Sequence, residues 1–281
     1  MHLIFTAVLL ALSATVAVAQ TPEGTELNCR IEPHVTVNVS SAVEGLISEV
    51  LVDKNHRVKQ GDVLARLEAG LETATAELRK VQAELESDVD AQQLAFDFSQ
   101  RALTRVTNLY EKKAASFAEL DKAKTEHALA AQQLQQANDR KRQAALEHNR
   151  ALADLQRRTI RSPIDGIVVD RYKQPGEHID YEPVLQLAQL DPLRVEVFAP
   201  ASLYGLIKEG MEATVTPELA IARKTYIAEV VLVDQVIDAP SNTFGIRLSF
   251  PNPDYQLPSG LKCTVRFSGV KSPNNLLSGG L

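Results

Sequence analysis

The side chains that could bind a metal or perform catalysis are spaced in ways that argue against both. The chain has too few methionines, 2 in all, for a methionine-rich soft-metal site. It also lacks a Ser/His/Asp nucleophile motif, a phosphate-binding P-loop and a Rossmann glycine fingerprint. None of the 6 histidines has the spacing of metal ligands: His2, His34, His56, His127, His148 and His178. We therefore expect no catalytic residue, no cofactor and no metal site.

A second set of residues has a spacing suited to recognition. Arg105 and Leu109 are four residues apart, so on a helix they share one face. Ser116 follows seven residues later, and its hydroxyl could cap a helix or form a hydrogen bond across an interface. Two interpretations stay open. The three residues form a docking surface, or they are a solvated charge, a packed leucine and an ordinary helix cap.

The region that contains these residues is predicted to be helical. Residues 71–157 include no proline and no glycine, which is rare outside helices. In the second part of this region alanines recur every seven residues, which is typical of a helix that packs closely on another. These alanines are Ala123, Ala130, Ala137, Ala144 and Ala151.

The first part of the helical region carries an apolar stripe of its own. Two successive four-residue steps, Val81 to Leu85 to Val89, indicate a local unwinding of the supercoil. The stripe consists of Leu71, Ala74, Leu78, Val81, Leu85, Val89, Gln92, Phe96, Ser99, Leu103, Val106 and Tyr110. The patterns predict an antiparallel coiled-coil α-hairpin over residues 70–157, with its tip near residues 113–117. The alternative is a parallel coiled coil between two chains.

The segments on either side of this region repeat each other at a constant offset, with Gly45 matching Gly166. A half-domain that occurs twice predicts one small β domain split by the helical insertion. Its halves are residues 41–69 and 158–190, and residues 20–40 lead into it. We expect turns at Gly61 and Gly176, and at Gly45 and Gly166 matching backbone positions that disfavour a Cβ.

The remainder of the chain reads as a small β-barrel and two terminal segments. Residues 191–269 form short alternating strands separated by turn residues, as in a barrel. Residues 270–281 are polar and glycine-rich, and we expect a flexible tail. Residues 1–19 are largely apolar and end in Ala-Val-Ala, which predicts a cleavable signal peptide. The alternative is an uncleaved anchor in the inner membrane; either way the rest lies outside the cytoplasm.

Charge and cysteine content narrow the function further. The net charge of −6 leaves no basic excess for binding nucleic acid. The two cysteines, Cys29 and Cys263, would meet an oxidising compartment in an exported chain. A disulfide between them is therefore allowed, and two separate thiols are the alternative.

The two half-repeats resemble biotinyl and lipoyl domains. The resemblance rests on Val43-Glu44-Gly45 and residues 58–64 in the first half, and on residues 165–168 and 175–179 in the second. Carrier domains of this type hold their cofactor on a lysine in the hairpin between the halves. Here Glu68-Ala69-Gly70 leads directly into the helical region, so the attachment lysine is missing.

A split lipoyl-like domain with a helical hairpin, a β-barrel and a signal peptide resembles the periplasmic adaptors of the HlyD and RND type. These are the membrane fusion proteins of tripartite efflux pumps. Residues 252–261 also resemble a late barrel segment of that family. The resemblance implies an elongated α+β fold and a non-enzymatic role in efflux of small molecules. It implies Arg105, Leu109 and Ser116 as the tip motif that grips a TolC-like outer-membrane channel.

The partners implied by the resemblance are an inner-membrane transporter, the TolC-like channel, and further copies of this chain in a ring. The ring would be a hexamer or a trimer of dimers. Two other functions remain open at this point. One is a biotinyl- or lipoyl-type carrier component of an enzyme complex, and the other is a structural coiled-coil protein of the cell envelope.

Overall fold

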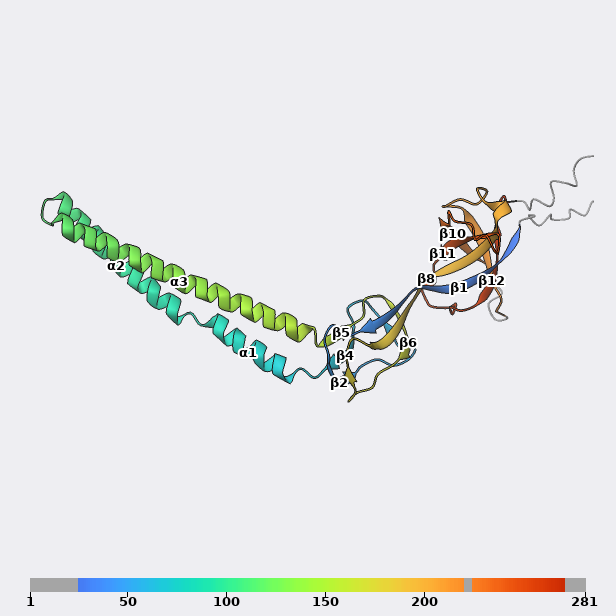
Figure 1. The fold of residues 1–281 in the computed structure, drawn as a ribbon, viewed down its shortest axis with the longest axis horizontal. Coiled ribbons are helices and arrows are strands. Elements are labelled where there is room, and N and C mark those ends of the chain that lie inside the picture. Colours follow the sequence, from blue (N-terminus) through green and yellow to red (C-terminus); the bar gives the residue numbers. More distant parts are fainter. Residues whose placement is uncertain (1–24, 220–223, 271–281) are drawn as a thin grey trace, which may run out of the picture. The chain divides into compact units, whose positions relative to one another are not determined.

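The computed structural model describes residues 25–219 and 224–270 of the 281-residue chain (Figure 1). The predicted signal peptide and residues 271–281 of the predicted tail lie outside the described residues. The chain forms two compact units. One contains residues 35–189, and the other contains the described residues before and after them. No helix within the described ranges is both long and apolar enough to cross a membrane.

The first unit contains the split β domain. Strands β2 and β7 pair with each other, and so do β3 and β6, so each pairing joins one half of the domain to the other. The strands of the first half are β2 (Gly45–Val50), β3 (Arg57–Val58) and β4 (Val63–Leu67). The strands of the second half are β5 (Thr159–Arg161), β6 (Gly166–Arg171) and β7 (His178–Ile179). Strands β1 (Glu26–Ser40) and β8 (Pro183–Pro200) belong partly to this unit and partly to the other.

The two halves are related by an approximate two-fold exchange. Gly45 lies opposite Ile179, and in the matching pair Gly166 lies opposite Val58. Backbone hydrogen bonds follow the same exchange. The Ile47 amide donates to Glu177 over 2.9 Å, and the Val168 amide donates to His56 over 3.0 Å. The shared core contains equivalent residues from both halves, including Ile47, Leu64, Val168 and Leu185. The repeat seen in the sequence is thus one folded domain.

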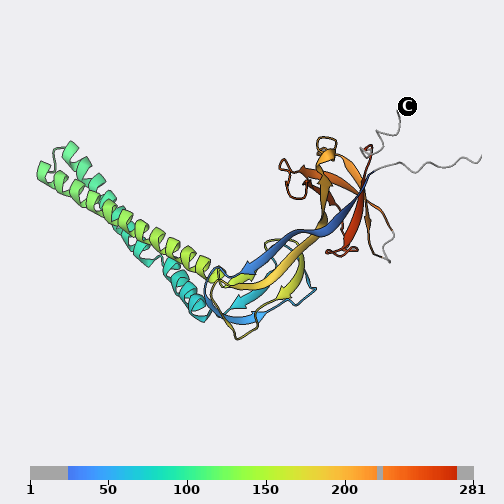
Figure 2. The same ribbon diagram turned by 45° about the vertical axis from the view of Figure 1, so that its right-hand side comes forward.

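Between the halves the chain forms a helical hairpin, in which α3 runs alongside α1 and α2 (Figures 1 and 2). The helices are α1 (Gly70–Glu84), α2 (Ser87–Glu111) and α3 (Phe117–Gln156). The predicted column of alanines is the face that α3 buries, with Ala123, Ala130, Ala137 and Ala151 buried. The small alanine side chains allow α3 to lie close to its partners.

The outgoing arm differs from the expectation in two respects. It is broken rather than continuous, because Leu85 after α1 has an extended conformation (φ −68°, ψ 117°). The predicted stripe on α1 is also exposed: the side chains of Leu71 and Leu78 are 76% and 57% exposed. The residue that α1 buries is Ala76. The predicted stripe is partly buried on α2 from Val89 to Val106, so the prediction was correct there; it was wrong for α1 and for Tyr110, which is exposed.

The second unit is a six-stranded β-barrel. Its strands follow the order β1-β12-β9-β10-β11-β8, and an additional pairing between β1 and β8 closes the barrel. The strands not yet introduced are β9 (Glu212–Pro217), β10 (Tyr226–Val233), β11 (Thr243–Phe250) and β12 (Lys262–Phe267). A short 3-10 helix, η1 (Ala201–Leu203), follows β8. Phe244, Phe250 and Phe267 are among the largest buried side chains.

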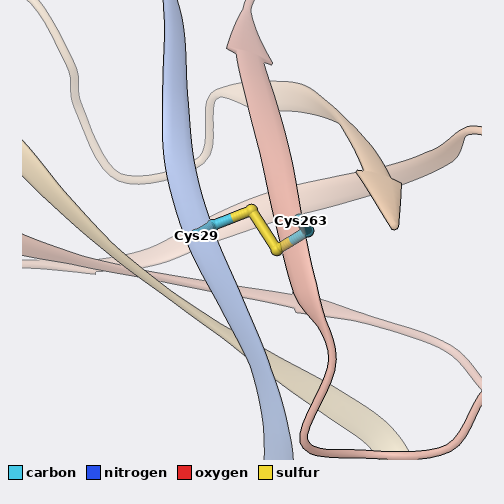
Figure 3. The surroundings of a disulfide bond; sticks show 2 residues. All are labelled: Cys29 and Cys263. Carbon is cyan, nitrogen blue, oxygen red and sulfur yellow. A yellow bond between two sulfur atoms is a disulfide. The ribbon is translucent and has the colours of Figure 1, made fainter. Parts of the chain in front are cut away.

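A disulfide and a buried asparagine fasten the barrel. Cys29 on β1 lies directly opposite Cys263 on β12, and the two form a disulfide bond (Figure 3). The side chain of Asn252 is buried and bonds three backbone groups. It donates to the carbonyls of Leu190 and Leu257, each over 3.0 Å, and accepts from the Leu257 amide over 3.1 Å. This explains why residues 252–261 form a recognisable segment, since the asparagine anchors it to β8.

Candidate docking site at the hairpin tip

The turn at the hairpin tip is short and well bonded. The amides of Lys112, Lys113 and Ala114 donate to carbonyls in the last turns of α2, at 3.3, 2.9 and 2.8 Å. These bonds satisfy carbonyl groups that a helix end otherwise leaves unpaired. Lys113 has a left-handed backbone (φ 61°), a conformation that helix ends usually assign to glycine. The tip is therefore a defined turn between α2 and α3.

Ser116 begins α3 as its N-cap. Its hydroxyl accepts from the Glu119 amide over 3.2 Å, while its own amide donates to the Glu119 carboxylate over 2.7 Å. Together these bonds form a capping box. The Ser116 backbone amide, and then its hydroxyl, donate to the Glu119 carboxylate and hold its pKa below the usual value. The Ser116 hydroxyl is thus engaged within the turn.

Arg105 and Leu109 lie on one exposed face of α2, one turn apart. Leu109 is 47% exposed, too much for a side chain enclosed in the seam. Arg105 lines a shallow groove of about 430 Å³ on α2, together with Asp97, Gln100, Arg101 and Thr104. The arginines offer planar, multivalent donors, and Leu109 offers apolar area beside them. This face can bind a surface that carries carboxylate or carbonyl oxygens next to apolar groups.

Two exposed aromatic side chains at the tip were not singled out by the sequence patterns as surface groups. Phe117 is 66% exposed in the first turn of α3, and Tyr110 is also exposed. Phe117 lies outside both apolar stripes, and this position in the sequence could have indicated that its side chain is exposed. Large aromatic side chains are enriched in the centres of protein interfaces. The tip therefore presents Leu109, Tyr110 and Phe117 around the turn.

The four glycines predicted at turns and matching backbone positions have structural roles. A Cβ on Gly166 would lie 2.3 Å from the Ala188 carbonyl oxygen, so this position requires glycine. At Gly45 a Cβ would lie 2.7 Å from Nη1 of Arg158, which is a side-chain atom that can move. Gly61 and Gly176 have left-handed backbones, with φ values of 90° and 88°.

His127 on α3 packs against α2. Its Nδ1 lies 3.1 Å from the Ser99 hydroxyl, and its ring centroid lies 4.9 Å from that of Phe96. Across residues 25–219 and 224–270, no group of three or more histidine, cysteine or acidic side chains could hold a metal ion.

Comparisons with known proteins point to a single family. The model of the CzcB-like barrel-sandwich hybrid domain matches residues 35–188, more than half of the chain. The UPF0194 membrane protein YE2891 of Yersinia enterocolitica is 25% identical over 283 residues, covering 83% of this chain and 86% of the relative. The cobalt-zinc-cadmium resistance protein CzcB of Cupriavidus metallidurans is 24% identical, covering 86% of this chain and 44% of the relative.

Solved structures share the fold. MacA from Actinobacillus actinomycetemcomitans superimposes with a TM-score of 0.72 at 24% identity, covering 88% of this chain and 79% of MacA. The membrane fusion protein Spr0693 from Streptococcus pneumoniae superimposes with a TM-score of 0.60 at 14% identity, covering 88% of this chain and 99% of Spr0693.

Proposed function

Because this chain belongs to the periplasmic adaptors with a CzcB-like barrel-sandwich hybrid domain, the membrane fusion proteins of efflux pumps, we propose that it joins an inner-membrane transporter to a TolC-like outer-membrane channel. Proteins of this family are non-catalytic. The proposed cargo is small molecules, and the energy source is the transporter. We also propose that the chain is exported to the periplasm by residues 1–19 and works as a ring.

The observation that carries the proposal is the exposed face of Arg105 and Leu109 at the tip of the hairpin. Helix α3 has 40 residues and is therefore about 60 Å long at 1.5 Å per residue. A helical arm of this length separates the tip from the β domain and leaves it free to reach a second protein. Arg105 supplies charge-assisted hydrogen bonds and Leu109 supplies apolar contact, while Ser116 fixes the geometry of the turn.

A ring follows from the geometry of a conduit. One hairpin presents one narrow arm, and a single arm cannot enclose a passage for a solute. Several copies arranged around an axis would surround such a passage and present one tip each to the channel. The hexamer and the trimer of dimers both meet this requirement. Both contain six copies and have the same mass, so partial dissociation of the native complex distinguishes them: a trimer of dimers releases dimers.

Photocrosslinking at the tip tests the docking proposal. A photoreactive amino acid at Leu109 of the full chain is irradiated in cells, and the captured protein is identified by mass spectrometry. The matched control carries the same amino acid at Leu129, an exposed leucine of α3 away from the tip. We expect an outer-membrane channel from position 109 and none from position 129. Equal capture from both positions, or no outer-membrane protein from 109, contradicts the proposal.

Two measurements distinguish the alternative functions. A carrier protein would show an added lipoyl or biotinyl mass on a lysine of the intact chain. A structural envelope protein would leave solute accumulation unchanged when its gene is deleted, and no transporter or channel would co-purify with it. An adaptor shows the unmodified mass, higher solute accumulation on deletion, and both partners in the purified complex.

A further inference from the structure

Helix α1 presents its polar face to α3 and its apolar face to solvent. Its large aliphatic residues Leu71, Leu78 and Val81 are all at least half exposed, and so is Leu85, which follows the helix. The positions toward α3 are instead Glu72, Ala76 and Arg79, of which Ala76 is 5% exposed. An amphipathic helix ordinarily turns its apolar stripe toward its packing partner. The observed arrangement of α1 is the reverse.

The exposed stripe of α1 is in phase with the packed stripe of α2. Counting in sevens along the outgoing arm gives Leu71, Leu78, Leu85, Gln92, Ser99 and Val106. The last three are partly buried on the side of α2 that packs on α3. Residues seven apart on a continuous helix drift by only about 20° per heptad. In an unbroken helix the three leucines would therefore also face α3.

Helix α3 offers a suitable surface for those leucines. Its heptad column of alanines continues along α1 through Ala144 and Ala151. Small side chains in such a column leave room for large side chains of the facing helix. The same α3 surface can thus accept either the polar face or the apolar face of α1.

Four ion pairs hold α1 and the break in the observed position. Along α1, Arg79 pairs with Glu147 over 2.9 Å and Glu72 pairs with Arg158 over 2.6 Å. At the break, Glu86 pairs with Lys141 over 2.5 Å and Asp88 pairs with Arg140 over 2.6 Å. Three of these pairs join the outgoing arm to α3, and the fourth joins Glu72 to Arg158, two residues after the end of α3. Most are solvent-exposed, so salt weakens them.

We propose that α1 is a two-position segment that rolls about its own axis at Leu85 and Glu86. In the observed position the ion pairs hold the polar face on α3 and the leucines are exposed. In the second position residues 70–111 form one helix, the leucines pack on the alanine column, and Ala76 becomes exposed. High salt favours the second position, because it screens the ion pairs and leaves apolar burial intact. The proposal is independent of the proposed function.

Cysteine labelling with a maleimide tests the roll in the full chain. Single cysteines replace Leu78, Ala76 and Leu94; the last is exposed on α2 and serves as the reference in both positions. At low salt we expect L78C to label as fast as L94C and A76C to label slowly. High salt should slow L78C and speed A76C together. The unsubstituted chain is the blank, since Cys29 and Cys263 are joined in the disulfide.

Two further variants keep the test decisive. E86Q/D88N removes the charges at the break, and two exposed pairs are expected to shift the ratio of A76C to L78C labelling by roughly three- to tenfold. L85P fits the observed φ of −68° but interrupts a continuous helix, so it should abolish the salt response. L85A is its matched control and should retain that response.

The proposal is overturned if the A76C to L78C ratio is unchanged by salt and by E86Q/D88N. It is also overturned if L78C slows without a gain at A76C, which would mean that another molecule covers the stripe. Circular dichroism confirms that each variant is folded before labelling.

Discussion

Arg158, which follows the returning helix α3, forms a 2.6 Å ion pair with Glu72 in the first turn of α1. The same guanidinium donates to the Glu44 carbonyl over 3.0 Å. Both side chains of the pair are less than a quarter exposed. Arg158 thus links the start of α1, the end of α3 and the start of the first β half-domain.

Replacement of Arg158 by alanine should destabilise the unit of residues 35–189. It removes hydrogen bonds of a charged group to a carboxylate and to a carbonyl, and leaves Glu72 without this partner. Bonds of this kind contribute about 1.5–3 kcal/mol each, so we expect a loss of roughly that size or more in the free energy of unfolding. Denaturant unfolding measures it. R157A is the control, because Arg157 is half exposed and bonds a single β-domain carbonyl, that of Ala42.

The two glycines at matching repeat positions should differ in their tolerance of a side chain. G166A places a Cβ against the Ala188 carbonyl oxygen, which is fixed backbone, and should cost about 3 kcal/mol or more. G45A displaces Nη1 of Arg158, which donates to the Glu44 carbonyl, but a side chain can shift, so we expect a smaller cost of about 1.5 kcal/mol. Thermal unfolding of the two variants gives the comparison. Equal losses would argue against the packing described for Gly166.

The capping box at Ser116 should depend on pH. The Glu119 pKa is lowered in the folded state, so the box stabilises the start of α3 above the pKa of the unfolded chain. That stability is lost as the pH falls through the lowered pKa of the folded state. S116A should reduce amide-exchange protection in the first turn of α3 by roughly fivefold at neutral pH. The difference from the parent chain should shrink in acid; a constant difference would contradict this account.

Charge reversal at Arg105 should weaken docking and leave the fold intact. Arg105 is exposed, and a negative charge in its place would repel the acceptor groups that the arginine would bind. We expect R105D to lower photocrosslinking to the channel by about tenfold or more. R142D, on an exposed part of α3 away from the tip, is the matched control. Unchanged crosslinking of R105D at equal expression would reject the docking role.

Removal of the disulfide should destabilise the barrel and spare the hairpin. Cys29 and Cys263 are separated by 234 residues, and a bond that closes a long loop restricts the unfolded chain. We expect C29S/C263S to lower the stability of the barrel by about 2–4 kcal/mol. Hydrogen exchange should rise in β1 and β12 while the exchange of α2 and α3 is unchanged. Uniform acceleration over the whole chain would instead indicate one cooperative unit.

The repeat, the hairpin and the barrel could be predicted from the sequence, because each produces a periodic or local pattern of residues. Gly45 and Gly166 marked the two halves, and the alanines of α3 marked the face it buries. The orientation of α1 could not be predicted in this way. Its leucines have the spacing of residues that pack on another helix, whereas the observed orientation pairs Arg79 with Glu147 of α3 and Glu72 with Arg158 just beyond it. Such pairs depend on distances between helices, which periodicity does not contain.

For the proposed docking residues, the sequence predicted a shared helix face and a helix cap but not the surroundings of the side chains. The spacing of Arg105 and Leu109 placed them on one helix face, and Ser116 had the residue type of an N-cap. The exposure of Phe117 and the left-handed turn at Lys113 depend on how the chain reverses direction. Lysine gives no local signal for that conformation, because glycine is the usual residue there.

The division of one β domain into two distant halves also constrains how the chain folds. Gly45 must find Ile179, and Val58 must find Gly166, across the whole helical region. Contacts so far apart in sequence form slowly in a flexible chain, because closing a long loop costs entropy. Helices form from local contacts and can zip together from the tip, which brings Glu72 beside Arg158 and leaves only short segments to close. A hairpin that forms first would therefore serve as an internal template for the pairing of the two half-domains.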